Sequence, residues 1–254
     1  MILLFTDFGL AGPYVGQMRA VLAGAAPGIA TIDLMHDAPA HDPRRAAYLL
    51  AALAHGFEPG TVCVGVVDPG VGSARPPLIL EADGRWFVGP GNGLFELVRR
   101  RARRARHWRI TWRPARLSAT FHGRDLFAPV AAMIARGDPP PGDAIEMAAA
   151  DSHRGAEPPG AGWPDDLPEI VYIDGFGNLM TGLRADSVHP AAVLVAGGVE
   201  IRAARTFAES ATGAPFWYGN SCGLVEIAVN QGSAAHRLGL AAGDPVAVNP
   251  PGPR

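Results

Sequence analysis

The 254-residue chain contains no lysine, and all 22 of its basic residues are arginine. A Walker-A phosphate loop, a pyridoxal Schiff base, a lysine general base and a Ser-Lys dyad are therefore impossible in this chain. Cysteine is nearly as scarce, since Cys63 and Cys222 are the only two and stand far apart. Without CxxC spacing they predict neither a disulfide framework nor a zinc ribbon.

Long apolar runs and an excess of one charge are missing too. No run of about 18 apolar residues predicts a membrane span. The first residues have no basic segment and reach an acid at Asp7, so they do not resemble a signal peptide, and we expect a cytoplasmic protein. The 22 basic and 24 acidic side chains give a net charge of −2, which predicts no general attraction to nucleic acid or to an anionic membrane.

One segment departs from this balance, because residues 99–106 hold six arginines in eight positions. A nucleic-acid patch is one interpretation of such a run. We favour the exposed face and last turn of a helix, because cations suit that end of the helix dipole.

The apolar residues, 48% of the chain, are patterned for folded domains rather than for disorder. Apolar strand patterns first alternate with helical spacing and include a hairpin signal at Asp83-Gly84, which predicts a layered α/β domain with a partly parallel sheet over residues 1–164. Residues 137–168 are rich in proline and glycine and lead to the domain boundary. Short strand patterns beyond them predict a smaller all-β domain over residues 165–254. Strands are predicted at 1–6, 30–34, 61–67, 78–81, 86–88, 169–173, 192–195, 199–201, 225–228 and 244–248, and helices at 16–26, 43–54 and 93–101.

Two common kinds of site are not supported by the motifs. The glycine-rich stretches at 9–12, 70–75 and 89–93 lack GxGxxG spacing, so a Rossmann cofactor site is not expected. A metal cluster is one hypothesis for a crowded group of acids and histidines, but solvated loop residues are the commoner explanation, and we predict no metal site. That group is Asp33, His36, Asp37, His41 and Asp42.

Four short polar segments flanked by glycine stand at predicted strand ends, at residues 5–9, 67–75, 120–125 and 174–178. Asp7 and Asp68 each follow an apolar run directly, so we expect both carboxylates at one edge of the sheet, where open α/β sheets bind ligands. A single Asp beside Gly or Pro is more often a turn or helix cap. Four such segments together favour a functional site.

These segments resemble the S-adenosyl-L-methionine (SAM) hydroxide adenosyltransferase family, relatives of the SAM-dependent chlorinase and fluorinase. The resemblance covers nearly the whole chain and implies an N-terminal α/β domain with a C-terminal β-barrel-like domain. It also implies homotrimers that bind SAM where one subunit's N-terminal domain meets a neighbour's C-terminal domain. The matching elements, in family order, are TDFG at 6–9, VVDPGVGSAR at 66–75, FHGRD at 121–125, DGFGN at 174–178 and NSCGLVEIAVNQG at 220–232.

The reaction implied by this resemblance is SAM plus water giving adenosine and L-methionine, by in-line attack of a hydroxide equivalent on the ribose C5′. The sulfonium is already a good leaving group, so no cofactor and no metal are expected and SAM is the substrate. The family's Asp-Arg-His set maps onto Asp68, Arg75 and His122, which would orient and partly deprotonate the water. The division of roles among the three stays open, since a neutral imidazole can accept as well as donate.

The substrate contacts implied by the resemblance come from both domains. Asp7, next to Phe8 in the same segment, would accept both ribose hydroxyls. Asp174 and Ser221 would hold the amino-acid group of methionine. Phe176 would offer a stacking surface, although core packing is an equal alternative for it. The contacts around the nucleobase would come from Asn178, Glu226 and the backbone near Val229, and Asn220 is a further expected substrate-binding residue.

Three alternatives remain open. A halogenase would use chloride or fluoride as the nucleophile, but halogenating relatives lack the Asp-Arg-His set and carry an inserted loop that we do not find before residue 120. A nucleoside-binding protein without turnover would have no use for a water-activating trio. An RNA-binding protein would use residues 99–106, and a salt-dependent gel shift would reveal it.

Overall fold

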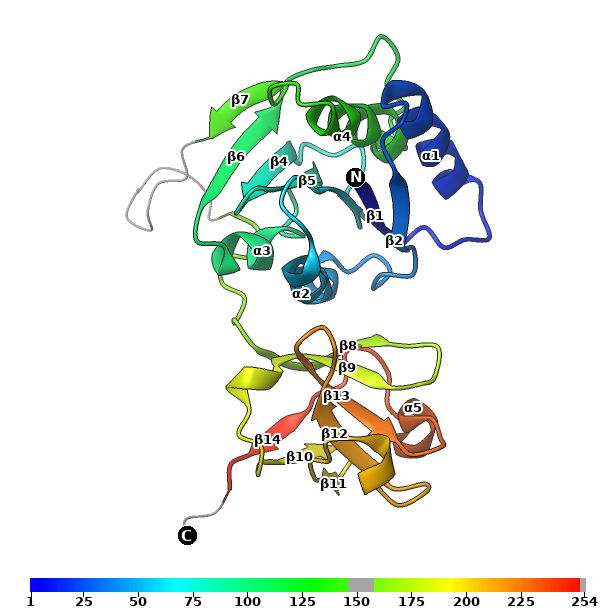
Figure 1. Cartoon of the computed structure of the whole chain (residues 1–254), viewed down its shortest axis with the longest axis vertical. Helices are drawn as coiled ribbons and strands as arrows, with labels where there is room; N and C mark the ends of the chain where they lie inside the picture. The colour runs from blue at the N-terminus through cyan, green and yellow to red at the C-terminus, as the bar shows by residue number, and fades with distance from the viewer. Residues whose placement is uncertain (146–157, 252–254) are drawn as a thin grey trace. The chain divides into compact units, whose positions relative to one another are not determined.

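The computed structural model describes residues 1–145 and 158–251, and the chain divides into two compact units, Met1–Trp163 and Pro164–Arg254 (Figure 1). The first unit is a mixed α/β sheet with helices, and the second is built from antiparallel strands. The predicted fold class is therefore confirmed. In the described ranges, no helix is long and apolar enough to cross a membrane.

The N-terminal unit is organised around a seven-stranded sheet of order β2-β1-β3-β5-β4-β6-β7. Strands β2, β1, β3 and β5 run parallel, whereas β4, β6 and β7 join antiparallel. Strands β1 and β3 are buried along their whole length, as central parallel strands with continuous apolar sequence should be. The strands are β1 (Ile2–Thr6), β2 (Thr31–Met35), β3 (Val62–Val66), β4 (Pro77–Ala82), β5 (Arg85–Pro90), β6 (Ala105–Ile110) and β7 (Gly142–Ile145).

Helices cover both faces of this sheet, with α1 and α4 on one face and α2 and α3 on the other (Figure 1). Met18 and Leu22 of α1 pack with apolar residues of α4, β1 and β3 in one core. Helix α2 begins where the Asp42 carboxylate accepts the Arg45 amide hydrogen at 3.0 Å, with proline at its first position. The helices are α1 (Tyr14–Ala25), α2 (Pro43–Leu53), α3 (Glu96–Arg101) and α4 (Ala128–Ala135), with a π-helical turn at Gly123–Phe127.

The arginine-rich segment folds differently from the prediction. Its first three arginines lie in the last turn of α3, in agreement with the helix predicted at 93–101, whereas Arg106 lies in β6, so the helical interpretation is wrong for the arginines beyond residue 101. The chain turns between them because the Asp83 carboxylate accepts two backbone hydrogen bonds from the turn, at 2.9 and 3.0 Å. Glu96 and Glu81 pair with arginines of this segment, so part of its charge is neutralised within the chain.

The C-terminal unit consists of two antiparallel sheets, of order β12-β13-β9-β8 and β11-β10-β14. Apolar residues from both sheets and from α5 share one core. Two of its strands, β9 and β12, were not predicted from the sequence. Its elements are β8 (Leu167–Ile173), β9 (Leu179–Arg184), β10 (Val193–Ala196), β11 (Val199–Ile201), β12 (Pro215–Gly219), β13 (Leu224–Val229), α5 (Ala234–Leu238) and β14 (Ala247–Asn249).

Candidate active site

The carboxyl ends of β1 and β3 lie side by side in the N-terminal unit. Thr6 stands opposite Val66 in parallel register, and the amide of Asp7 donates to the Val66 carbonyl at 3.4 Å. Asp7 and Asp68 therefore leave the sheet at the same edge, as the sequence predicts. This edge is where open α/β sheets place their ligands.

Asp68, Arg75 and His122 meet at this edge. Arg75 Nε donates to Asp68 Oδ1 at 2.6 Å, and Arg75 Nη2 donates to Asp68 Oδ2, so the ion pair is bidentate. The same Nη2 lies 3.3 Å from His122 Nδ1. The side chains of Asp68 and Arg75 are only 4% and 9% exposed. Arg75 thus links the well-buried Asp68 carboxylate to the partly buried His122 ring.

The loop after β3 is shaped to bring Arg75 back to Asp68. Gly72 has a φ of +83°, and a Cβ at this position would lie 2.9 Å from the Ala119 carbonyl oxygen. Only glycine allows this close approach to the segment that leads to His122. At the start of the loop, Asn92 Nδ2 donates to the Val67 carbonyl at 2.8 Å. The glycine-rich stretch around Asn92 therefore supports the loop that carries Asp68.

The segment that carries His122 is anchored to α1. His122 directly precedes the π-helical turn, and Arg124 within that turn donates to Gln17 Oε1 at 2.7 Å. Arg124 also pairs with Asp125, whose Oδ2 accepts the Ser118 amide hydrogen at 2.8 Å. A π-helical turn is an uncommon form that is often found at functional sites.

The proton of the His122 ring can be assigned from its partner. A guanidinium only donates, so the Arg75 contact requires His122 Nδ1 to accept, and the proton is then on Nε2. Burial, followed by the Arg75 charge, lowers the pKa of His122. At neutral pH the cluster therefore holds a neutral imidazole with an Nε2–H donor.

Asp7 is positioned by the loop that follows β2. Its side chain is 9% exposed, and Oδ2 accepts the His41 amide hydrogen at 2.9 Å. His41 has a φ of 57°, a left-handed backbone conformation that is uncommon for a residue other than glycine. Next to Asp7, the ring of Phe8 lies 5.9 Å from the rings of both Tyr14 and Phe121.

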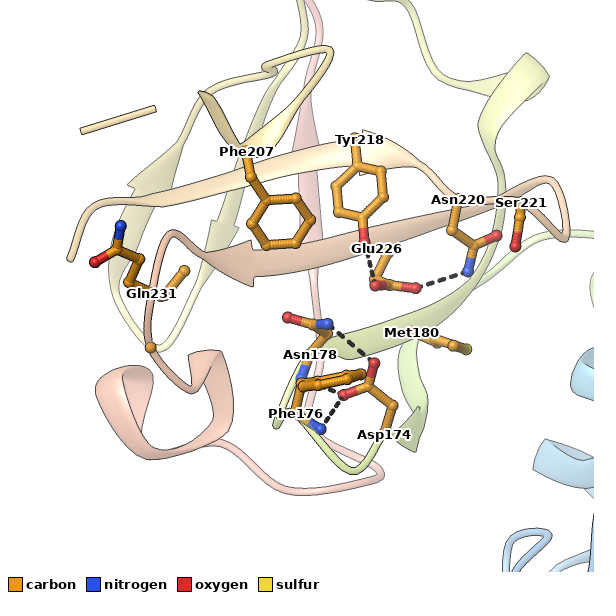
Figure 2. A pocket seen from close by; sticks show the side chains of 12 residues that line it. Asp174, Phe176, Asn178, Met180, Phe207, Tyr218, Asn220, Ser221, Glu226 and Gln231 are labelled. Atoms are coloured by element: carbon orange, nitrogen blue, oxygen red, sulfur yellow. Dashed lines mark hydrogen bonds between the residues drawn. The ribbon is translucent and has the colours of Figure 1, made fainter. Parts of the chain in front are cut away.

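A second group of predicted residues surrounds a pocket of about 790 Å³ in the C-terminal unit (Figure 2). Tyr218 lines this pocket, whereas Trp217 is buried in the core and donates Nε1 to the Ala192 carbonyl at 3.2 Å. Met180, Phe207, Gln231 and Gly232 line it as well and were missed in the sequence. The seven predicted residues that line it are Asp174, Phe176, Asn178, Asn220, Ser221, Glu226 and Val229.

Glu226 is the buried carboxylate of this pocket, 3% exposed. It accepts hydrogen bonds from the Tyr218 hydroxyl and from Asn220 Nδ2, the latter at 2.8 Å (Figure 2). Burial and the hydrogen bond to Glu226 raise the pKa of Tyr218, so its phenol stays protonated and donates. Neither donor carries a charge, and the carboxylate oxygens keep lone pairs that can accept further hydrogen bonds from a molecule in the pocket.

Asp174 is used largely within its own turn. Its Oδ1 accepts the amide hydrogens of Phe176 and Asn178, both at 2.9 Å, and its Oδ2 accepts from Asn178 Nδ2 at 2.9 Å. Gly177 closes the turn with a φ of +82°, where a Cβ would lie 2.1 Å from Ser233 Oγ. The turn projects Phe176 outward, and this aromatic residue is 82% exposed. Core packing is therefore excluded for Phe176.

The crowded acids and histidines of residues 33–42 form no metal centre that the structure supports. In residues 1–145 and 158–251, no group of three or more His, Cys, Asp or Glu side chains is placed to hold a metal ion. Several of these residues are instead engaged with the protein. Asp42 caps α2, and His36 Nδ1 lies 2.8 Å from Thr6 Oγ1.

Comparisons with known proteins identify the family of the chain. The family models of the SAM hydroxide adenosyltransferase N-terminal and C-terminal domains match residues 2–143 and 168–247. The chain is 43% identical to the (R)-S-adenosyl-L-methionine hydrolase of Thermus thermophilus, over 96% of this chain and 98% of that protein. It is 24% identical to the fluorinase of Actinopolyspora mzabensis, over 98% and 96% of the two chains.

A solved structure gives the same result at the level of the fold. The crystal structure of an uncharacterized conserved protein from Thermotoga maritima matches with a TM-score of 0.84 and 31% identity, covering 98% of this chain and 100% of that one. The matches extend over both units and include every motif segment described above. The chain therefore belongs to the SAM hydroxide adenosyltransferase family.

Proposed function

We propose that the chain hydrolyses SAM to adenosine and L-methionine by attack of water on the ribose C5′, and that it prefers the (R) epimer at sulfur. The observation that carries this proposal is the cluster of Asp68, Arg75 and His122 at the sheet edge from which Asp7 also emerges. The 43% identity to a relative named for (R)-SAM hydrolysis supports both the reaction and the epimer.

The chemical task of the cluster is to activate water. Bulk water has a pKa of about 15.7, so its oxygen must be oriented and relieved of part of its proton in a sheltered site. His122 Nδ1 is occupied by Arg75 and its Nε2 carries a proton, so this ring donates and does not act as the base. Asp68 is the remaining acceptor, because each carboxylate oxygen keeps a lone pair beside its bond to Arg75.

In the proposed step, the water oxygen forms a bond to C5′ while the C5′–S bond breaks. The electron pair of that bond goes to sulfur, which leaves as the neutral thioether of methionine. Asp68 accepts the proton of the water, and the Nε2–H of His122 holds its oxygen. Arg75 contacts both Asp68 and His122 and so holds them in position relative to each other.

The remaining substrate contacts come from the pocket of the C-terminal unit. Asn178 and Glu226 would face the base, with Ser221 near the amino-acid group, while Asp174 acts first as the cap of its turn. We propose that a homotrimer in the cytoplasm completes each site with the N-terminal unit of one subunit and this pocket of another. The exposed rings of Phe176 and Phe207 at this pocket support this, since an apolar patch favours contact with a ligand or a second subunit.

Product analysis tests the function directly. Purified protein is incubated with (R)-SAM or (S)-SAM, with and without chloride or fluoride, and the nucleoside is identified by mass. We expect adenosine in every case and faster turnover of the (R) epimer, because water is the nucleophile. A 5′-halogenated nucleoside would establish the halogenase alternative, and binding of adenosine without any turnover would establish the binding protein.

The acid limit of activity should lie below the usual pKa of histidine, about 6.5. Burial and the Arg75 charge lower the pKa of His122, so the required neutral ring persists as the pH falls and is lost only below that value. The profile of kcat against pH, together with an NMR titration of His122, measures this. An Arg75→Gln variant should shift the His122 titration upward, and an acid limb above pH ~6.5 in the wild type would contradict the assignment.

A further inference from the structure

His36 is a buried histidine that the proposed mechanism does not use. It follows β2 directly and is 4% exposed. Its Nδ1 lies 2.8 Å from Thr6 Oγ1, and its Nε2 lies 3.2 Å from Asp33 Oδ1. Thr6 is fully buried at the end of β1 and immediately precedes Asp7. A row of polar side chains, Asp33, His36 and Thr6, thus ends beside the residue proposed to bind the ribose.

The protons along this row can be assigned. The Asp33 carboxylate that faces Nε2 only accepts, which favours the imidazole proton on Nε2. His36 Nδ1 is then the acceptor of the Thr6 hydroxyl hydrogen at 2.8 Å, while Thr6 Oγ1 accepts the Phe8 amide hydrogen at 3.3 Å. Nε2 faces the Asp33 carboxylate at ion-pair distance, without the alignment of a full hydrogen bond.

The backbone joins the same two segments. His36 contributes its main chain as well as its side chain, so it contacts the Asp7 loop twice. The amide of Gly9 donates to the His36 carbonyl at 2.7 Å, that of Ala38 to the Thr6 carbonyl at 3.1 Å, and that of His41 to Asp7 Oδ2 at 2.9 Å. The position of Asp7 is therefore determined by hydrogen bonds to Thr6 before it, to Gly9 after it and to its own carboxylate.

We propose that His36 is a positioning residue that acts through the Thr6 hydroxyl to fix the direction in which Asp7 leaves β1. The proposal rests on the proposed role of Asp7 in binding the ribose of SAM. Without the imidazole, a fully buried hydroxyl has no acceptor for its proton and turns to satisfy it elsewhere, which costs stability in the arrangement that holds Asp7. The expected consequence is weaker ribose binding with the chemical step preserved.

Four variants test this. His36→Leu removes the acceptor, Thr6→Val removes the hydroxyl with little change of shape, and His36→Asn keeps an acceptor near the position of Nδ1. The exposed His55→Asn is the matched control. We expect His36→Leu and Thr6→Val to raise the KM for SAM and the Kd for adenosine about tenfold, with kcat within about threefold of wild type. His36→Asn should recover most of the affinity. The double variant His36→Leu/Thr6→Val should bind no more weakly than either single variant.

Discrimination against 2′-deoxyadenosine separates positioning from stability. In His36→Leu and Thr6→Val, the ratio of the Kd for 2′-deoxyadenosine to the Kd for adenosine should fall toward one, because a misdirected Asp7 no longer selects the 2′-hydroxyl. The proposal is overturned if both variants keep the wild-type discrimination and lose only thermal stability, or if His36→Asn binds no better than His36→Leu. Failure of the wild type to hydrolyse SAM would contradict the proposed function alone, since the adenosine measurements need no turnover.

Discussion

Replacing His122 by alanine is expected to lower kcat for SAM hydrolysis about 10²–10⁴-fold and to leave the Kd for adenosine nearly unchanged. The reason is that, in the proposed mechanism, the Nε2–H of His122 holds the attacking oxygen and has no part in binding the nucleoside. Single-turnover and steady-state rates with (R)-SAM, with adenosine affinity by calorimetry, measure the two quantities separately.

Matched variants decide what His122 does. His122→Gln keeps an N–H donor near the position of Nε2, so it should retain more activity than alanine, whereas an essential base would be lost equally in both. Arg75→Ala combined with His122→Ala should be little worse than either change alone, because groups that act as a unit fail together. In H₂¹⁸O the label should enter the 5′-hydroxyl of adenosine and not methionine. If the variants lost only substrate binding and kept kcat, the role in water activation would be contradicted and Asp68 would be a substrate ligand.

Asp7→Asn is expected to weaken binding of SAM and adenosine alike by about 1.5–3 kcal/mol, the range for a charge-assisted hydrogen bond. Asparagine still offers an oxygen to the His41 amide, so the loop keeps its cap while the charge that would accept the ribose hydroxyls is lost. Calorimetry with adenosine and 2′-deoxyadenosine provides the comparison.

The two ligands also supply the control for this prediction. Wild-type protein should bind 2′-deoxyadenosine more weakly than adenosine, and Asp7→Asn should hardly distinguish them. Equal discrimination by the two proteins would mean that Asp7 serves only as an acceptor for the loop after β2.

The elements that the sequence predicted well are those with strong local signals. Strands β1 and β3 are continuous apolar runs, and β4 and β5 flank the Asp83-Gly84 turn, so a few neighbouring residues suffice to identify them. Strand β9 was missed because its apolar pattern is broken by Gly182, where a Cβ would lie 2.6 Å from the Leu167 Cβ. The close packing that requires this glycine involves the neighbouring strand, and a local pattern does not reveal it.

In the candidate site too, local sequence patterns do not reveal contacts between segments that are far apart in the chain. The two carboxylates at one sheet edge were predicted because each directly follows an apolar strand run. In contrast, 47 residues separate Arg75 from His122, and their meeting depends on the path of two loops. Because β12 was not predicted, the sequence does not show which of the neighbours Trp217 and Tyr218 faces the pocket. Once that strand is known, alternation alone sends one side chain to the pocket and the other to the core.

The low solvent exposure of the Asp68–Arg75 ion pair affects how such a site can change during evolution. Removing either partner alone leaves the other charge buried without compensation, which costs about 3–5 kcal/mol, a large share of a typical domain's stability. Many active sites become more stable when a functional residue is lost. Here the loss of one residue would penalise folding as well as the proposed turnover, so mutational drift away from the proposed water activation would have to replace the two residues together.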